Sequence, residues 1–305
     1  MFGFILRRLA VAVPTLLMLI VVSFVLMHAA PGGPFTQERA LPPQVLANLE
    51  AKYGLDRSLP EQIWTYVSGI VTRFDFGPSF VYPDRSVNDI IAQGFPVTLT
   101  YGAIGFALSV VIGVALGVVA AIRHNTWLDT LAVGVSIGAQ VLPNFVIAPI
   151  LVLVLTLWLR WLPGGGWGGW PYWVMPIIAL ALSHMASIAR LTRSSMLEVL
   201  GSNHIRTARA KGLSERAVIL RHALKPAMLP VISYLGPLFV TMITGSVVVD
   251  MYFSTGGIGR SFVDSALSRD YAVMMGITIL VGALTIFFNL LVDVLYAWID
   301  PKIRY

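Results

Sequence analysis

The sequence predicts an all-α, polytopic membrane protein with six transmembrane helices and a small extracytoplasmic cap after the first helix. Of its 305 residues, 57% are hydrophobic and only 12% are charged, and the mean hydropathy is +0.79. Soluble domains carry roughly 25% charged residues, so this chain cannot cover its surface in water. Six long uncharged runs, each near the roughly 20 residues that a spanning helix needs, give the number of spans.

The six expected spans follow one another along the chain. The third contains Pro143 and Pro149, which should kink it, and the last should continue past Asp293 to Ile299. We expect the first span to be retained, because its apolar run is longer than the roughly 7–15 residues of a signal-peptide core. The spans are Leu9–Ala30, Val97–Ile122, Leu131–Leu159, Trp173–Ala189, Pro226–Val249 and Tyr271–Val292.

The basic residues predict the orientation. One side of the membrane carries 13 Lys and Arg and the other carries 8, of which five lie in the long segment 31–96. Loops of that length are poor topology signals. Without that segment, one side carries 13 Lys and Arg and the other carries 3. Both termini and the loop 190–228 are therefore expected in the cytoplasm. The chain then divides into a tail with the first helix (1–30), an extracytoplasmic cap (31–96) and a core (97–305).

The cap contains two stretches with apolar residues at helical spacing, Gln44–Tyr53 and Leu59–Ile70. In the second stretch, Trp64 is spaced with Val67 and Ile70, and we expect all three side chains in the core of the cap. This pattern predicts a folded surface that meets a receptor or shapes the mouth of a pore.

Two GxxxG pairs lie in the expected spans, Gly113 with Gly117 and Gly134 with Gly138. Such pairs let helix backbones approach closely, so both should serve helix packing. The pattern does not identify the helix on the other side of either contact.

Several classes of chemistry find no support in the sequence. The chain has no cysteine, which excludes thiolate catalysis, Fe–S clusters and disulfides. The glycine-rich run Pro163–Trp170 lacks the Lys-Ser/Thr ending of a phosphate cradle and is bordered by tryptophans, as in an interfacial belt. The five histidines form no metal motif, so we expect no catalytic residue, no metal site and no cofactor in this chain. Asp293 is interpreted as a polar contact near the cytoplasmic end of its helix rather than a proton or substrate group.

The cytoplasmic loop 190–228 predicts a helix–glycine–helix elbow. Ser202 and Asn203 can cap a short helix that runs to Lys211, and Gly212 suits a left-handed C-cap. Ser214 can then start a second helix. The small side chains of the first helix, at Ala208 and Ala210, should leave room for another protein to dock. The alternative is a basic loop that only fixes topology or touches anionic lipid.

The run Ile205–Gly212 resembles the coupling-loop signature of binding-protein-dependent ABC importers: Glu-Ala-Ala, three residues, Gly, and later Leu-Pro, here Leu229-Pro230. The chain has Arg206-Thr207-Ala208 in place of Glu-Ala-Ala and a longer spacing to Pro230, and both departures resemble the peptide/nickel branch of the family. Thr255–Gly259 departs from relatives, which commonly carry Pro-Gly there. Further similar segments are Phe2–Arg8, Ala30–Thr36, Asp75–Phe80, Trp161–Trp167, Ala186–Arg190, Arg221–Pro226 and Val292–Tyr305.

This resemblance implies a permease subunit of the type I ABC importer kind in the bacterial inner membrane. Its implied partners are a C-type permease subunit, an extracytoplasmic peptide-binding protein and two cytoplasmic ATPases, which would use the ATP and Mg. The implied cargo is oligopeptides, with dipeptides or nickel as alternatives within the family. An ion-coupled secondary transporter, or a receptor that does not transport, is the alternative outside it. The residues implied in ATPase coupling are Arg206, Thr207, Ala208, Arg209, Ala210, Lys211 and Gly212.

Overall fold

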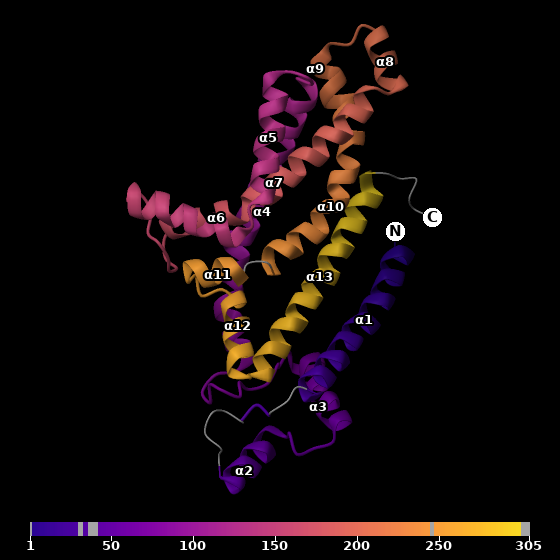
Figure 1. Ribbon diagram of the computed structural model, residues 1–305. Coiled ribbons are helices and arrows are strands. Elements are labelled where there is room, and N and C mark those ends of the chain that lie inside the picture. The colour runs from indigo at the N-terminus through magenta and orange to yellow at the C-terminus, as the bar shows by residue number, and fades with distance from the viewer. Residues whose placement is uncertain (1, 30–32, 36–41, 245–246, 300–305) are drawn as a thin grey trace. The chain divides into compact units, whose positions relative to one another are not determined.

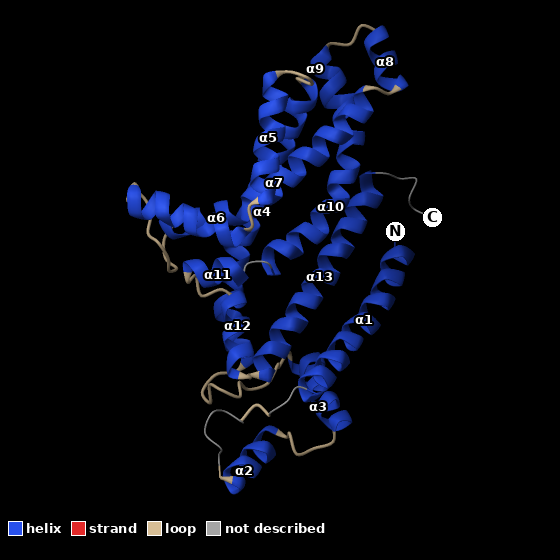
Figure 2. Cartoon of the chain, in the orientation of Figure 1, coloured by secondary structure: helices blue, strands red, loops and turns tan. Residues whose placement is uncertain are grey.

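The computed structural model of the chain describes all residues except 1, 30–32, 36–41, 245–246 and 300–305. The described residues form helices and loops, with one isolated bridge between Pro78 and Ser86 and no strand (Figure 2). The all-α prediction is therefore confirmed. Ala30, the first residues of the expected cap and the tail 300–305 lie outside the described residues.

The chain divides into two compact units. The division falls within two long helices, α4 (Val87–Ile122) and α13 (Tyr271–Ile299), and in the loop at residues 255–256. The first unit comprises residues 1–98 and 256–286, and the second comprises residues 99–255 and 287–305. Besides its parts of α4 and α13, the first unit contains α1 (Phe2–Ala29), α2 (Pro43–Tyr53), α3 (Leu59–Arg73) and α12 (Ile258–Ser268) (Figure 1). The second contains α5 (Trp127–Val141), α6 (Asn144–Leu151), a π-helix (Val152–Trp158), α7 (Pro171–Leu200), α8 (Asn203–Ala210), α9 (Glu215–Ala217), a second π-helix (Val218–Ala223), α10 (Leu224–Thr244) and α11 (Val247–Phe253).

Five described helical stretches are long and apolar enough to cross a membrane, and a bent pair of helices supplies a sixth. This agrees with the six predicted spans. In chain order the six are Leu6–Ala29, Val87–Ile122, the pair Trp127–Val141 and Phe145–Trp158, Pro171–Leu200, Glu215–Phe253 and Tyr271–Val294.

The third span is the bent one, as predicted from the presence of Pro143 within it. Its two halves meet at an angle of 105°. Pro143 stands at the break with an extended backbone (φ −64°, ψ 152°) and precedes the first residue of α6. Proline has no N–H to donate, so the helix cannot continue through it with its backbone bonds intact.

Two helices extend beyond their apolar runs. α4 begins at Val87 rather than Val97, because Ser86 and Asp89 form a reciprocal cap: the Ser86 N–H and hydroxyl donate to the Asp89 carboxylate at 3.0 and 2.6 Å, and the Asp89 N–H donates to the Ser86 hydroxyl at 3.1 Å. α7 continues past Ala189 to Leu200. A charged side chain ends an apolar run but does not end a helix, since the hydrogen bonds of a helix join its own backbone groups whatever side chains it carries.

In the first unit, α1, α3 and α13 pack around a small apolar cluster. Ile20, Met275 and Ile279 form its buried centre, and Tyr66, Val67 and Ile70 of α3 pack against it. Val67 and Ile70 pack in a core as expected, but that core is centred on α1 and α13 rather than within the cap, and the placement of Trp64 is wrong. Its side chain is 74% exposed, because Tyr66 and Ile70 define the buried face of α3 and Trp64 lies off that face.

Asp270 fixes the segment that follows α3 onto the start of α13. Its carboxylate is fully buried and accepts hydrogen bonds from the Ser79 hydroxyl and from the backbone N–H groups of Phe80 and Val81 at 3.2 and 3.3 Å. It also accepts from the N–H of Val273 at 3.3 Å, so it caps the N-terminus of α13. The positive end of the helix dipole stabilises the buried carboxylate there.

In the second unit, α4 and α7 approach closely at one GxxxG pair. A Cβ atom on Gly117 would lie 2.5 Å from the carbonyl oxygen of Ala189 and 2.6 Å from the Cβ of Thr192. A Cβ on Gly113 would lie 2.8 Å from the carbonyl oxygen of Met185. The other pair, Gly134 and Gly138 of α5, has no described atom within 4 Å of such a Cβ. The packing prediction is therefore confirmed for the first pair, and the second pair faces open space within this chain.

We predict that Gly117→Ala destabilises the protein and Gly138→Ala does not. The added methyl of Gly117→Ala must push α4 away from the backbone of α7, and overpacking of this kind costs about 1–3 kcal/mol. Gly138→Ala adds the same methyl group on a spanning helix where no described atom of this chain meets it. Thermal unfolding midpoints of the purified full-length chain in detergent measure both variants. Equal midpoints for the two would contradict the close-packing assignment.

Candidate functional site

The second unit carries the predicted elbow, made of α8, the turn 211–214, α9 and the π-helix after it (Figure 1). Ser202 occupies the N-cap position of α8 with an extended backbone, as expected. Its hydroxyl does not cap the helix. It donates to the carbonyl oxygen of Val199 at 2.6 Å and lies 2.8 Å from Nδ1 of His204. Ser202 therefore links α8 back to the end of α7.

Gly212 makes the turn of the elbow, as predicted. Its φ of +79° lies in the left-handed region, where other residues are strained by roughly 1–2 kcal/mol. Its N–H donates to the carbonyl oxygen of Arg209 at 2.9 Å, and the next N–H, of Leu213, reaches that of Ala208 at 3.4 Å. This pair of bonds is the Schellman arrangement that ends a helix at a glycine.

An ion pair spans the turn. The Arg209 guanidinium donates to both carboxylate oxygens of Glu215, at 2.7 and 3.2 Å. Both side chains are largely exposed, so the pair contributes little to stability but orients Arg209 across the turn.

The inner side of the elbow is apolar and buried. Ile205 and Ala208 of α8 are 0% and 6% exposed and belong to one cluster with residues of α4, α7, the second π-helix and α10. The other members of the cluster are Ala121, Met196, Val218, Ala223 and Ala227. The elbow is therefore packed onto the ends of three long helices and does not hang from the protein as a loose loop.

This packing changes the interpretation of Ala208. Its small side chain was expected to leave room for a docking protein, but it points into the chain's own core, where it lets α8 approach its neighbours. The other six residues of the expected coupling set are exposed, and the small side chains among them are Thr207 and Ala210. The exposed six are Arg206, Thr207, Arg209, Ala210, Lys211 and Gly212.

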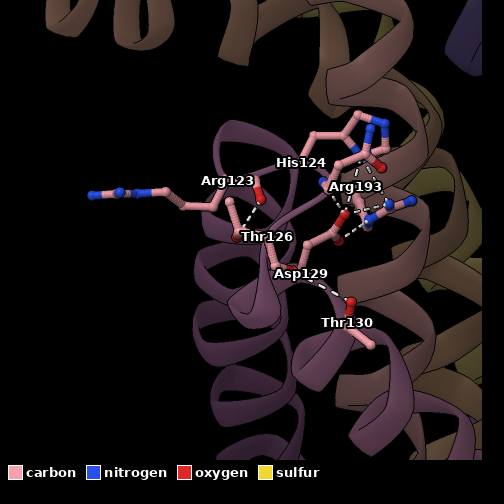
Figure 3. A network of polar contacts seen from close by, with 7 residues as sticks. Arg123, His124, Thr126, Asp129, Thr130 and Arg193 are labelled. Atoms are coloured by element: carbon pink, nitrogen blue, oxygen red, sulfur yellow. Dashed lines mark hydrogen bonds and ion pairs between the residues drawn. The ribbon is translucent and has the colours of Figure 1, made fainter.

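A buried polar cluster lies in the same unit, where the turn after α4 meets α7 (Figure 3). The Asp129 side chain is only 5% exposed and receives two hydrogen bonds from Arg193, from Nε at 2.6 Å and from Nη2 at 2.8 Å. The N–H of Asn125 donates to the same carboxylate at 3.0 Å, and Nδ1 of His124 lies 3.0 Å from it. This forked pair fixes the start of α5 to α7.

Sequence reasoning missed this cluster and two other buried acids, Asp250 and the Asp270 described above. Asp129 and Arg193 are 64 residues apart, and no motif joins them. Asp250 of α11 is fully buried and accepts hydrogen bonds from the hydroxyls of Tyr101 and Thr255. Asp293, which the sequence singled out, is half-buried in α13, and its interpretation as a polar contact stays a prediction. In the described part of the chain, no three His, Asp or Glu side chains gather as a metal site would require.

We predict that the Asp129–Arg193 pair stabilises the second unit. Arg193→Ala leaves the buried Asp129 carboxylate without its guanidinium. This should lower the unfolding midpoint by several degrees, because the remaining partner becomes a buried charge with no opposite charge beside it. Arg193→Lys should lower the midpoint by less than Arg193→Ala does. The ammonium keeps the positive charge beside Asp129 but cannot make the forked contact. The matched control is Arg206→Ala, an exposed arginine with no ion pair among the described residues. A drop as large for Arg206→Ala as for Arg193→Ala would refute this role.

Comparison with known proteins places both parts of the sequence in one family. Residues 113–305 match the family described as "Binding-protein-dependent transport system inner membrane component", and residues 1–102 match its N-terminal counterpart. The chain is 56% identical over 307 residues to "Oligopeptide transport system permease protein OppB" of Salmonella typhimurium, covering 100% of both chains. It is 42% identical to "Dipeptide transport system permease protein DppB" of Bacillus subtilis, covering 99% of this chain and 97% of that one.

Solved structures show the same kind of fold. The inward-facing MetNI methionine ABC transporter matches with a TM-score of 0.58 at 16% identity, over 69% of this chain and 96% of the other. An amino acid ABC transporter matches with a TM-score of 0.51 at 15% identity, over 70% of this chain and 94% of the other. At these identities the likeness concerns the fold alone. The sequence matches along the whole chain and the six-span helical fold together show that the chain belongs to the family of binding-protein-dependent transport system inner membrane components.

Proposed function

We propose that this chain is a membrane-spanning subunit of an ATP-driven importer that carries oligopeptides across the inner membrane. The observation that carries the proposal is the elbow: six exposed residues of the coupling signature stand on a buried cluster that joins α8 to α4, α7 and α10. The 56% identical relative over its full length is an oligopeptide permease protein, which supports the cargo. A 42% identical relative is a dipeptide permease protein, so dipeptides are the second candidate cargo.

The elbow is suited to transmit movement from a partner ATPase. Three of the exposed residues, Arg206, Arg209 and Lys211, are basic, and Thr207 and Ala210 between them are small. A docked protein can therefore approach the helix closely and find positive charge around the contact. Because Ile205 and Ala208 are packed against the membrane helices, a displacement of α8 displaces those helices too. ATP binding and hydrolysis, with Mg, belong in this proposal to the partner ATPases.

The proposal includes two further partners, which membership of the family supports. An extracytoplasmic binding protein delivers the peptide, and a second, C-type permease subunit completes the pore. The glycine pair Gly134 and Gly138 supports a second membrane subunit, because it presents a close-packing surface on α5 that no described helix of this chain fills. The transport cycle alternates access between the two sides as the elbows move.

We predict that Ala210→Glu uncouples the importer while leaving this chain folded. The substitution adds bulk and a negative charge to the exposed, basic side of α8, so it should weaken ATPase docking and reduce peptide-stimulated ATP hydrolysis several-fold. Ala47→Glu, at an exposed alanine of α2, is the matched control; it should keep its ATPase subunits and the ATP hydrolysis measured without binding protein. The measurement is ATP hydrolysis by the purified complex with and without peptide-loaded binding protein.

The buried neighbour separates docking from folding. Ala208→Glu places a carboxylate in the apolar cluster and should loosen the elbow itself, seen as faster proteolysis between residues 202 and 217. Ala210→Glu should not change that proteolysis rate. Normal coupling and normal ATPase recovery in Ala210→Glu would rule out this face of α8 as the docking surface.

The proposal also requires α8 in the cytoplasm and the cap outside. Cysteines introduced at Asp56 and Ser214, both exposed, should differ in reaction with a membrane-impermeant thiol reagent, because the natural chain has no cysteine to compete. In intact cells stripped of the outer membrane, we expect labelling of Asp56→Cys and protection of Ser214→Cys until the membrane is opened. The reverse pattern would overturn the orientation and the coupling role with it.

A further inference from the structure

The first unit contains a cavity of about 370 Å³ that the proposed transport function does not use. It is bounded by the end of α1, the turn between α2 and α3, one side of α3, the segment 75–80 and the first turns of α13. Pockets that hold small ligands in proteins have volumes of roughly 300–1,000 Å³ and mostly apolar walls with a few polar groups. This cavity has the size and the lining of a ligand site.

The walls of the cavity are aromatic and apolar. Met27 of α1 and Met275 of α13 line the end beside the buried cluster of this unit. Six aromatic side chains surround the rest of the space. They are Phe24, Tyr53, Tyr66, Phe76, Phe80 and Tyr271.

Tyr66, which lines the cavity, carries a buried hydroxyl. The Tyr66 hydroxyl oxygen is buried and makes no hydrogen bond among the described residues. Burial, and secondarily the nearby Asp75 carboxylate, raise the pKa of Tyr66, so the hydroxyl keeps its proton and can donate. A buried donor without an acceptor is costly, so this side of the cavity holds an unsatisfied polar group beside its aromatic wall.

The polar residues at the cavity favour an anion. Three basic side chains line it, Lys52, Arg57 and Arg73, against one acidic side chain, Asp75. None of the three basic groups is in an ion pair within the described part of the chain. Asp75 is engaged locally, since its carboxylate accepts the N–H of Gly77 at 2.9 Å. The basic groups are thus available to a negatively charged ligand.

The cavity also lies at a membrane surface. Phe24 and Met27 belong to the last turns of the apolar span Leu6–Ala29, and Met275 belongs to the first turns of the span Tyr271–Val294. Lys52 and Arg57 lie outside any span, at the end of α2 and in the turn before α3. One end of the cavity is therefore apolar at the depth where two spans leave the hydrocarbon, and the other end is basic in the aqueous part.

We propose that this cavity binds an anionic phospholipid, with its phosphate among Lys52, Arg57 and Arg73 and the start of an acyl chain against Phe24 and Met27. The lipid ties α2 and α3 to the ends of α1 and α13. This inference goes beyond the proposed transport function and does not depend on the cargo or on which side of the membrane the cap lies.

The test is native mass spectrometry of the full-length chain, purified with the subunits that co-purify and titrated with dioleoyl-phosphatidylglycerol or dioleoyl-phosphatidylcholine. We expect phosphatidylglycerol to bind more tightly. The triple variant Lys52→Gln, Arg57→Gln, Arg73→Gln should weaken phosphatidylglycerol binding roughly tenfold or more, since each basic residue near a lipid surface contributes about 1 kcal/mol. The charge-matched control changes Arg123, Arg160 and Arg221 to Gln, three exposed arginines that do not line the cavity, and should keep the affinity.

A second pair of variants tests the apolar half without changing charge. Thr65→Trp fills the cavity and should abolish tight lipid binding, whereas Thr72→Trp, on the same helix outside the cavity, should not. Equal affinity for the two lipids, or unchanged phosphatidylglycerol binding in the triple variant or in Thr65→Trp, would overturn the proposal. Displacement of the lipid by free phosphate or by trileucine, at concentrations below that of the competing lipid, would overturn it in favour of a small anion or a peptide.

Discussion

The close approach of α4 and α7 at Gly113 and Gly117 is the contact on which the second unit depends. Side chains larger than hydrogen would meet the backbone of α7 at both positions. With the helices this close, α7 becomes half-buried along its apolar length, although it is a membrane-spanning helix of an isolated chain. Packing of this kind replaces the hydrophobic effect, which cannot drive one helix onto another within lipid.

The other parts of the second unit are arranged around α7. Arg193 binds Asp129 at the start of α5. Met196, one turn further along α7, belongs to the buried cluster against which α8 packs. The same helix therefore receives the polar contact of one neighbour and the apolar contact of the elbow. Ile205 and Ala208 share this cluster with Met196, so in the proposed coupling role a displacement of α8 would be passed to α7 through them.

The few buried acids in the described part of the chain join segments that are far apart in sequence. Asp129 and Asp250 in the second unit and Asp270 in the first each accept hydrogen bonds from groups on another segment or turn. A buried carboxylate is tolerated only with such partners, because its desolvation is costly. In a chain with 12% charged residues, these contacts determine where segments meet, while the apolar surface determines only that they lie in the membrane.

The sequence alone determined whatever depends on one segment at a time. The spans followed from apolar length, the bend followed from a proline without an N–H, and the turn at Gly212 followed from a backbone that only glycine enters without strain. The tertiary structure decided which side of each helix meets another. It placed one glycine pair in a contact and an identical pair in open space, and it exposed Trp64. It also turned Ala208 inward and Ala210 outward, because the direction a side chain faces depends on distant residues that lie near it only after the chain has folded.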